Sequence, residues 1–340
     1  QFITASGLGS DSIRQQLEAF SPRGMLDNFS LFIPLSPESE EHTVLKTNLV
    51  NTDIASVNNS PAMWGINGYL EIDYDPRARL ATGLAEIESE QFRINIPSVF
   101  VDTWEYDYVN GSLGFRLDLS QGRELKLVSG VIVAESEVVD GRVQFSSTLN
   151  RFDDGRRASS LELVVGALRF DAALKSVYLP NAPNVSDSIK TTMAWLDKAI
   201  LDGEISNSGA IYRGSTLPGS SEHSKTFQSF YRVDNGEVSF SEEWPELSQL
   251  SALVLSDDGE IDIHVRSGSS MAMNMEAVSA EIRRNELDEN WLEITGHVSG
   301  STTRGLNYLQ SIPVAAGLKN SLANWQADGN FAAEIEVRVP

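Results

Sequence analysis

The stretch SLGFRLDL, residues 112–119, shows the pattern that decides the fold of this chain. Its apolar residues Leu113, Phe115, Leu117 and Leu119 occupy every second position, with polar or small residues between them. Successive side chains of a β-strand point to opposite faces of the sheet. The stretch therefore predicts a strand with one apolar face and one solvated face.

The same alternation recurs along most of the chain, in the ranges 66–74, 92–96, 143–149, 161–165, 261–265, 292–294 and 335–339. Many of these runs reach about eight residues, which is longer than the usual strand of five or six. Between Met275 and Val278 the apolar positions change parity, which predicts a β-bulge near Glu276. We therefore expect an all-β chain with long antiparallel strands.

Helical patterns are confined to three short segments, near residues 11–20, 187–200 and 303–325, and a proline breaks the last of them. Each segment is followed by a glycine and a strand-like run, which is a weak internal repeat. We expect two modules, 1–185 and 186–340, and a final strand that opens a further repeat.

Composition excludes several classes of function. The 340 residues include 26 basic and 48 acidic ones, a net charge of −22, whereas binding to nucleic acid requires basic patches. The absence of cysteine removes disulfides and thiolate chemistry. No stretch reaches the roughly 18 apolar residues of a membrane-spanning helix. Because the chain starts at Gln1 without a methionine, we expect a segment of a longer protein.

The residues that usually carry catalysis do not gather in the sequence. The four histidines have no metal-ligand spacing, and two of them, His264 and His297, fall on the polar side of their strands. Neighbouring carboxylates such as Asp73 and Asp75 are typical of turns. No phosphate-binding loop or hydrolase motif occurs. We therefore expect no enzyme activity, no catalytic residue, no metal and no cofactor.

The apolar faces of so many strands need a cover, and three short helices are too small to provide it. A second sheet would complete a β-sandwich, whereas a long curved sheet would leave an open hydrophobic groove for a ligand. Periodicity does not separate these alternatives. Met271, Met273 and Met275 fall on one face of a predicted strand, where flexible thioethers suit either an ordinary core or a variable apolar ligand.

The order and spacing of many short motifs resemble the YhdP family of AsmA-like bacterial envelope proteins. The likeness covers roughly residues 60–340, and no single motif is diagnostic. The motifs are NGYLEID at 67–73, FRINIPSVF at 92–100, YDYVNGSLGF at 106–115, YLP at 178–180, WLDKA at 195–199, YRG at 212–214, EVSF at 237–240, WP at 244–245, AEI at 280–282, LEITG at 292–296 and SIP at 311–313.

The resemblance implies a repeating β-groove, or β-taco, curled around an apolar trough. It also implies a protein that is anchored in the inner membrane by a segment outside this sequence, crosses the periplasm and carries phospholipids toward the outer membrane. The partners would be phospholipid acyl chains and, through other parts of the protein, the two membranes. The alternative is a closed β-sandwich that binds carbohydrate or protein or acts as a scaffold in envelope assembly.

The apolar positions of the predicted strands are the candidate lining of such a groove. They are Phe92, Ile94, Leu113, Phe115, Leu125, Leu127, Val143, Phe145, Leu161, Leu163, Ile261, Ile263, Met271, Met273, Leu292 and Ile294.

Overall fold

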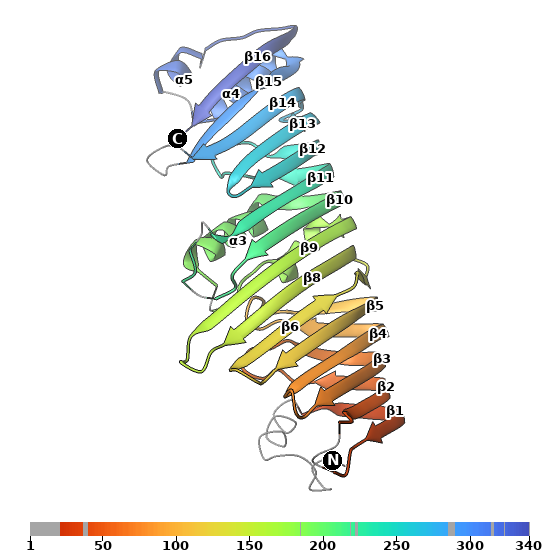
Figure 1. The fold of residues 1–340 in the computed structure, drawn as a ribbon. Helices are drawn as coiled ribbons and strands as arrows, with labels where there is room; N and C mark the ends of the chain where they lie inside the picture. Colours follow the sequence, from red (N-terminus) through yellow and green to blue (C-terminus); the bar gives the residue numbers. More distant parts are fainter. Residues whose placement is uncertain are drawn as a thin grey trace. The chain divides into compact units, whose positions relative to one another are not determined.

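A computed structural model describes residues 21–36, 40–183, 185–217, 219–221, 224–284, 290–313, 316–322 and 324–339 (Figure 1). Hydrogen bonds place its strands in one antiparallel sheet, in which neighbours follow the chain order and the short β7 pairs with β5 and β8. The predicted all-β fold with a single long sheet and short helices is confirmed, and the described residues do not form a sandwich of two sheets. The strands are β1 (Arg23–Phe32), β2 (Thr43–Ile54), β3 (Ala62–Asp75), β4 (Leu80–Asn95), β5 (Thr103–Asp118), β6 (Arg123–Ser129), β7 (Ile132–Glu135), β8 (Val139–Arg151), β9 (Arg157–Asp171), β10 (Ile200–Gly214), β11 (Thr226–Val238), β12 (Leu247–Asp257), β13 (Glu260–Ser270), β14 (Met273–Arg284), β15 (Asn290–Ser301) and β16 (Asn330–Val339).

The chain divides into two compact units, and neither is one continuous stretch. Unit 1 comprises the described residues within Gln1–Val165, Val177–Lys190 and Arg213–Lys225. Unit 2 comprises those within Gly166–Ser176, Thr191–Tyr212 and Thr226–Pro340. The division into two modules at residue 185, which the sequence suggested, stays a prediction.

The strands of unit 1 are interrupted by a series of bulges. The pairing register shifts around Asn28 on β1, Asn51 on β2 and Gly65 on β3, and β4 carries extra residues around Gln91. Each of these four residues has a positive φ, a conformation that glycine and asparagine adopt more readily than most other residues. Because a bulge bends its strand and raises the local twist, the sheet bends where these residues follow one another across it.

The strands of unit 2 also carry bulges at residues with a positive φ. The register shifts around Asn235 on β11, Gln249 on β12 and Ala277 on β14, and all three residues have a positive φ. The shift on β14 lies between Glu276 and Ser279, so the bulge that the sequence predicted near Glu276 is confirmed.

The helices form where the apolar spacing predicts them. Helix α3 spans Asp187–Ala199, and α4 (Thr302–Ser311) and α5 (Ala316–Leu322) occupy the third predicted segment. The Ser301 side chain caps α4 by accepting a hydrogen bond from the Arg304 amide at 3.4 Å. The helix predicted near 11–20 lies outside the described residues. A 3₁₀ helix, η1 (Ala172–Tyr178), was not predicted.

Two tight turns of unit 2 have the same backbone conformation but are formed by different types of residue. Asp258 and Gly259 join β12 to β13 with positive φ at both positions, as a two-residue hairpin turn requires. Met271 and Ala272 make the same turn between β13 and β14, although neither residue favours a positive φ. The Arg304 guanidinium donates a hydrogen bond to the carbonyl of Ala272 at 3.0 Å and holds this turn beside α4. The expectation that Met271 lies on a strand face is therefore wrong.

The bulge on β14 provides a test of backbone strain. Ala277 has φ +50°, which costs an alanine roughly 1 kcal/mol relative to glycine. We expect Ala277→Gly to raise the free energy of unfolding by about 0.5–1 kcal/mol, as read from urea denaturation.

Ala280→Gly is the matched control on the same strand, because Ala280 pairs regularly with Ile263 and Ile294 and does not have a positive φ. We expect this control to lower the free energy of unfolding, since glycine in a regular strand gains nothing and loses a methyl contact. Destabilisation by both substitutions would contradict the assigned bulge.

Candidate functional site: one apolar face in each unit

In unit 1 the strand register places the apolar side chains of successive strands beside one another. Leu45 pairs with Ile72, Ile72 with Gly83, Gly83 with Phe115 and Phe115 with Leu127. Directly opposite residues of an antiparallel sheet share a face, so these side chains form one row across five strands. A neighbouring row contains Leu70, Ala85 and Leu113, and another contains Tyr74, Ala81, Leu117, Leu125 and Leu149. We call these rows the unit 1 apolar face.

The bulges keep this face continuous past the bend. On β4 the inward positions are Ala85 and Ile87 before Gln91, and Phe92 and Ile94 after it. An alternation without a bulge would place Phe92 on the opposite face from Ile87. Gln91, whose φ is +54°, interrupts the alternation, and the apolar side chains on both sides of the bend pack into one cluster.

The bend itself is the best-buried part of unit 1. Ile66, Phe92 and Val109, the bend cluster, are only 3%, 5% and 4% exposed. Half-buried side chains from both sides of the bend pack against it, namely Leu49, Ile54, Met63, Ile87, Ile94, Tyr106, Ile132 and Ala134. Phe92 therefore packs against protein, whereas the rows farther from the bend are half-buried.

An aromatic group lies beside the bend cluster. The rings of Phe100 and Trp104 are 4.5 Å apart, and those of Trp104 and Tyr178 are 5.2 Å apart. The Trp104 indole donates a hydrogen bond to the Val177 carbonyl at 2.9 Å, which fixes the end of η1 against β5. Burial raises the pKa of Tyr106 well above its ordinary value, and the neighbouring Tyr178 adds to the effect. Burial also raises the pKa of Tyr178.

Unit 2 has an apolar face of the same design. Val254, Ile263, Ala280, Ile294 and Val337 pair in order across five strands. A neighbouring row holds Ile261, Ile282 and Leu292. We call these rows the unit 2 apolar face. The best-buried apolar side chains of its strands are Leu250, Met273 and Val278. Each lies at or next to a position where the strand register shifts or a hairpin turn begins.

Glycines let the rows of both faces approach closely. A Cβ on Gly83 would lie 2.4 Å from Cε1 of Phe115, so the phenyl ring occupies the space above the glycine. In unit 2 a Cβ on Gly268 would lie 2.6 Å from the Leu250 side chain, and one on Gly296 would lie 2.6 Å from Val278. Large side chains therefore lie across the sheet and cover the backbone of the next strand.

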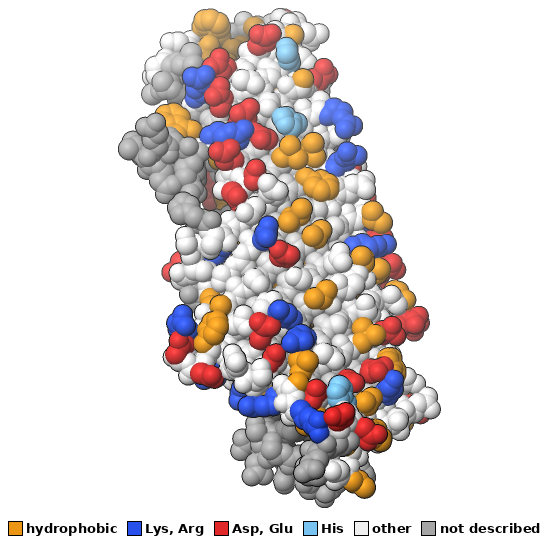
Figure 2. Space-filling view, in the orientation of Figure 1, with side chains coloured by type: hydrophobic (Ala, Val, Ile, Leu, Met, Phe, Trp, Pro, Cys, Tyr) orange, Lys and Arg blue, Asp and Glu red, His pale blue; other side chains and the backbone are white. Residues whose placement is uncertain are grey.

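The opposite faces of the strands carry charged side chains. Lys46 and Glu71 form an ion pair of 2.9 Å between β2 and β3, and the Tyr69 hydroxyl also donates to Glu71 at 2.9 Å. These two hydrogen bonds, from Lys46 first and Tyr69 second, lower the pKa of the Glu71 carboxyl. Figure 2 shows basic and acidic side chains interspersed over one face, with isolated hydrophobic ones between them.

The structure places most of the predicted lining residues on these two faces. In unit 1, Leu113 and Phe115 lie on β5, Leu125 and Leu127 on β6, Val143 and Phe145 on β8, and Leu161 and Leu163 on β9, all half-buried; Phe92 and Ile94 lie on β4 at the bend. In unit 2, Ile261 and Ile263 lie on β13, Met273 on β14, and Leu292 and Ile294 on β15; Met271, 43% exposed, lies in the turn before β14.

Several residues of the two faces were missed in the sequence. Leu45 was overlooked because its inward neighbour on the strand is polar: Thr47 is buried and its hydroxyl donates to the Asp27 carbonyl at 3.1 Å. Ile132 lies on a strand too short to show alternation, and Leu250 follows the bulge at Gln249.

Other kinds of site find no support in the described part of the chain. No group of three or more acidic or histidine residues there could hold a metal ion. His264 and His297 are exposed, as the alternation predicted. Asp75 accepts hydrogen bonds from the amides of Arg77 and Ala78 at 2.8 and 3.0 Å, which is the turn role that the sequence suggested. No helix in the described ranges is long and apolar enough to cross a membrane.

The close approach at Gly83 predicts an effect on stability. We expect Gly83→Ala to lower the free energy of unfolding by about 1–3 kcal/mol, because the new Cβ would also lie 2.5 Å from the Glu71 carbonyl oxygen. Gly114→Ala, on the adjacent strand, is the control, since its nearest neighbour would be 3.6 Å away. Equal urea midpoints for the two variants would contradict the packing of Phe115 over Gly83.

Burial of Tyr106 predicts sensitivity to alkali. A phenol whose pKa is raised in the folded state stabilises the fold below its ordinary pKa of 10, and this stability is lost as the pH rises above 10. Above pH 10 we expect the Tyr106 phenol alone to lower the free energy of unfolding by about 1.4 kcal/mol per pH unit. Tyr106→Phe should remove this contribution. Identical pH profiles between pH 9 and 11.5 for both proteins would contradict it.

Comparison with known proteins adds one finding. The sequence model of the YhdP protein family matches residues 1–340. No curated protein and no solved structure matches the chain. The family match agrees with the resemblance drawn from the short motifs and with the single long sheet. The chain belongs to the YhdP family.

Proposed function

We propose that this chain is a segment of a periplasmic lipid-transport protein, in which the apolar faces of the two units shield phospholipid acyl chains on their way between the inner and outer membranes. Membership of the YhdP family supports an envelope protein of the AsmA-like kind. The anchor in the inner membrane and the contact with the outer membrane belong to parts outside this sequence.

The observation that carries the proposal is the incomplete burial of the apolar rows. Ile72, Phe115 and Leu127 in unit 1, and Ile263 and Ile294 in unit 2, are all half-buried, although they lie in continuous rows. A closed core of this length would bury such side chains almost completely. Contiguous apolar surface on a soluble protein marks a site where another apolar molecule binds.

Hydrocarbon chains are suitable ligands for this apolar surface. Removing one methylene from water is worth about 0.8 kcal/mol, so exposing a sixteen-carbon acyl chain to water costs on the order of 12 kcal/mol. A wall of aliphatic and aromatic side chains offsets this cost through non-directional contacts. Such a wall needs no particular polar group, and lipid is able to move along it without leaving a deep binding site.

The chemistry of the rest of the chain is consistent with transport rather than catalysis. The faces consist of aliphatic, aromatic and small side chains with buried hydroxyls, such as those of Ser129 and Thr47, that are engaged in hydrogen bonds. The charged groups lie on the opposite side of the strands, where they keep the protein hydrated. In this proposal the chain has no reaction of its own, and the phospholipid headgroup stays in water at the margin of the apolar face.

Photocrosslinking tests the proposal residue by residue. We expect a photoreactive phenylalanine analogue at Phe145 or Ile294 to label phospholipid in cells of a Gram-negative host, because both positions lie on apolar faces. The matched controls are the adjacent exposed positions Gln144 and Thr295, whose side chains point to the other side of the strand. We expect at least several-fold weaker labelling there.

Equal labelling at inward and outward positions would contradict an acyl-binding face. Mass spectrometry of organic extracts of the purified protein separates the proposal from a carbohydrate- or protein-binding module. Phospholipid that co-purifies and is lost on delipidation supports transport, whereas lipid-free protein that crosslinks only to polypeptide would overturn it.

A further inference from the structure

The outward side of unit 2 carries two arginines and a histidine around the apolar side chain of Leu253. Arg232 on β11 pairs with Leu253 on β12, and Leu253 pairs with His264 on β13. The three residues therefore share one face and lie in a row. They lie on the side opposite to Val254 and Ile263, which belong to the unit 2 apolar face.

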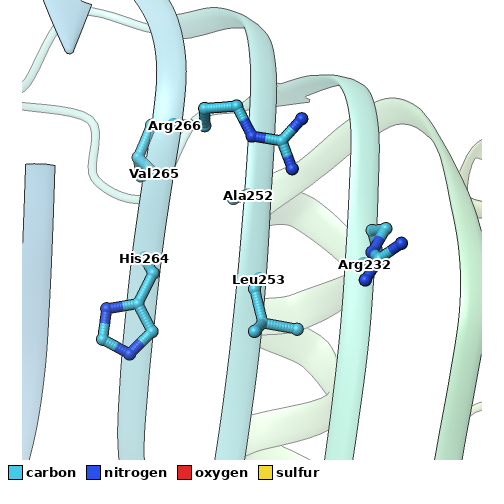
Figure 3. A pocket seen from close by; sticks show the side chains of 6 residues that line it. All are labelled: Arg232, Ala252, Leu253, His264, Val265 and Arg266. Carbon is cyan, nitrogen blue, oxygen red and sulfur yellow. The ribbon is translucent and has the colours of Figure 1, made fainter. Parts of the chain in front are cut away.

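Arg266 completes the group. It follows His264 by two positions on β13, so its side chain emerges on the same side of the strand. Figure 3 shows this side chain extending from its strand across the one that carries Ala252, toward the strand of Arg232. Together with Val265, these residues line a shallow cavity of about 230 Å³.

The charges in this cavity are not compensated. Within the described part of the chain, no hydrogen bond or ion pair engages the side chains of Arg232, His264 or Arg266, whereas Arg283 and Arg338 are held by two or more carboxylates each. The nearest carboxylate on the same side of β13, Asp262, is hydrogen-bonded to Arg283. Two unpaired arginines that line one cavity are unexpected in a chain of net charge −22.

The spacing suits one tetrahedral anion. Neighbouring strands are about 4.8 Å apart. Arg232 and Arg266 lie on the two strands that flank β12, so their long side chains can reach a common ligand above β12. Guanidinium groups bind phosphate oxygens through pairs of charge-assisted hydrogen bonds. Exposed apolar side chains adjoin the row, since Phe230 is 44% and Leu255 is 36% exposed and the two are paired.

We infer that this outward cavity, which we call the cationic cavity, is a binding site for a phosphoryl group that carries an apolar substituent. Arg232 and Arg266 bind the phosphoryl oxygens, and Leu253 with Phe230 contacts the substituent. This inference does not rest on the proposed lipid transport, because the cavity lies on the other side of the sheet from the apolar face. The ligand is either a soluble phosphate ester or the headgroup region of an anionic lipid.

Titration of the full chain with hexyl phosphate tests the inference. We expect the side-chain Nε–H signals of Arg232 and Arg266 in nitrogen-edited NMR spectra to shift together, with a dissociation constant on the order of 1 mM. Arg232→Gln or Arg266→Gln should weaken binding about fivefold or more. Leu253→Ala should weaken the binding of hexyl phosphate but not that of inorganic phosphate, since only hexyl phosphate has an apolar substituent.

Arg338→Gln is the matched control, because it changes the net charge equally but removes a side chain that is ion-paired with Glu293 and Glu336. Its affinity for hexyl phosphate should stay within about twofold of the unaltered protein. An equal loss in this control, or no shift of the two arginine signals, would overturn the inference.

Vesicle flotation identifies the source of the ligand. If vesicles containing phosphatidylglycerol bind the protein and Arg232→Gln abolishes this binding, the ligand is a lipid headgroup. If hexyl phosphate binds and these vesicles do not, the ligand is a soluble ester. Either result supports the cavity as a phosphoryl site, provided that the NMR shifts are present.

Discussion

The structure depends on one constraint: the apolar side chains of long strands must stay on the same side of a sheet that bends. A strand alternates strictly, so a bend alone would not preserve the side on which a given set of residues lies. The bulges at Asn51, Gly65 and Gln91 in unit 1, and at Asn235, Gln249 and Ala277 in unit 2, change the parity where the strands bend. The apolar face of each unit therefore continues across its bulges.

Burial is concentrated where the strands change direction. The bend cluster in unit 1 and the side chains of Leu250 and Val278 in unit 2 provide closely packed cores next to the bulges. Farther along the strands, rings and aliphatic groups lie over glycines of the adjacent strand, as Phe115 lies over Gly83. This arrangement covers the backbone but leaves the outer surface of the side chains partly exposed. It stabilises the sheet without sealing the apolar face.

The two sides of the sheet have separate tasks in this interpretation. The inward rows of each unit supply non-directional contacts, which suit hydrocarbon of any length. The outward side carries the charged side chains. Arginines there, such as Arg283 and Arg338, form ion pairs with neighbouring carboxylates. Arg232 and Arg266 depart from this rule, and the cavity that they line with Leu253 gives the outward side of unit 2 a chemistry that the apolar face lacks.

The sequence by itself determined the class of fold, the strands with regular alternation, two of the three predicted helical segments and the bulge near Glu276, because each of these follows from local periodicity and capping. Many of its candidate lining residues lie on the apolar faces, and their contact with lipid stays a prediction. Only the tertiary structure decided that one sheet rather than two forms, since that choice depends on which strands pair and not on their individual patterns. It also brought Leu45, Ile132 and Leu250 to the apolar faces and moved Met271 into a turn held by Arg304. Buried hydroxyls, short strands and bulges interrupt alternation locally, and the meeting of Arg232 with Arg266 across β12 depends on the register of strands that are distant in the sequence.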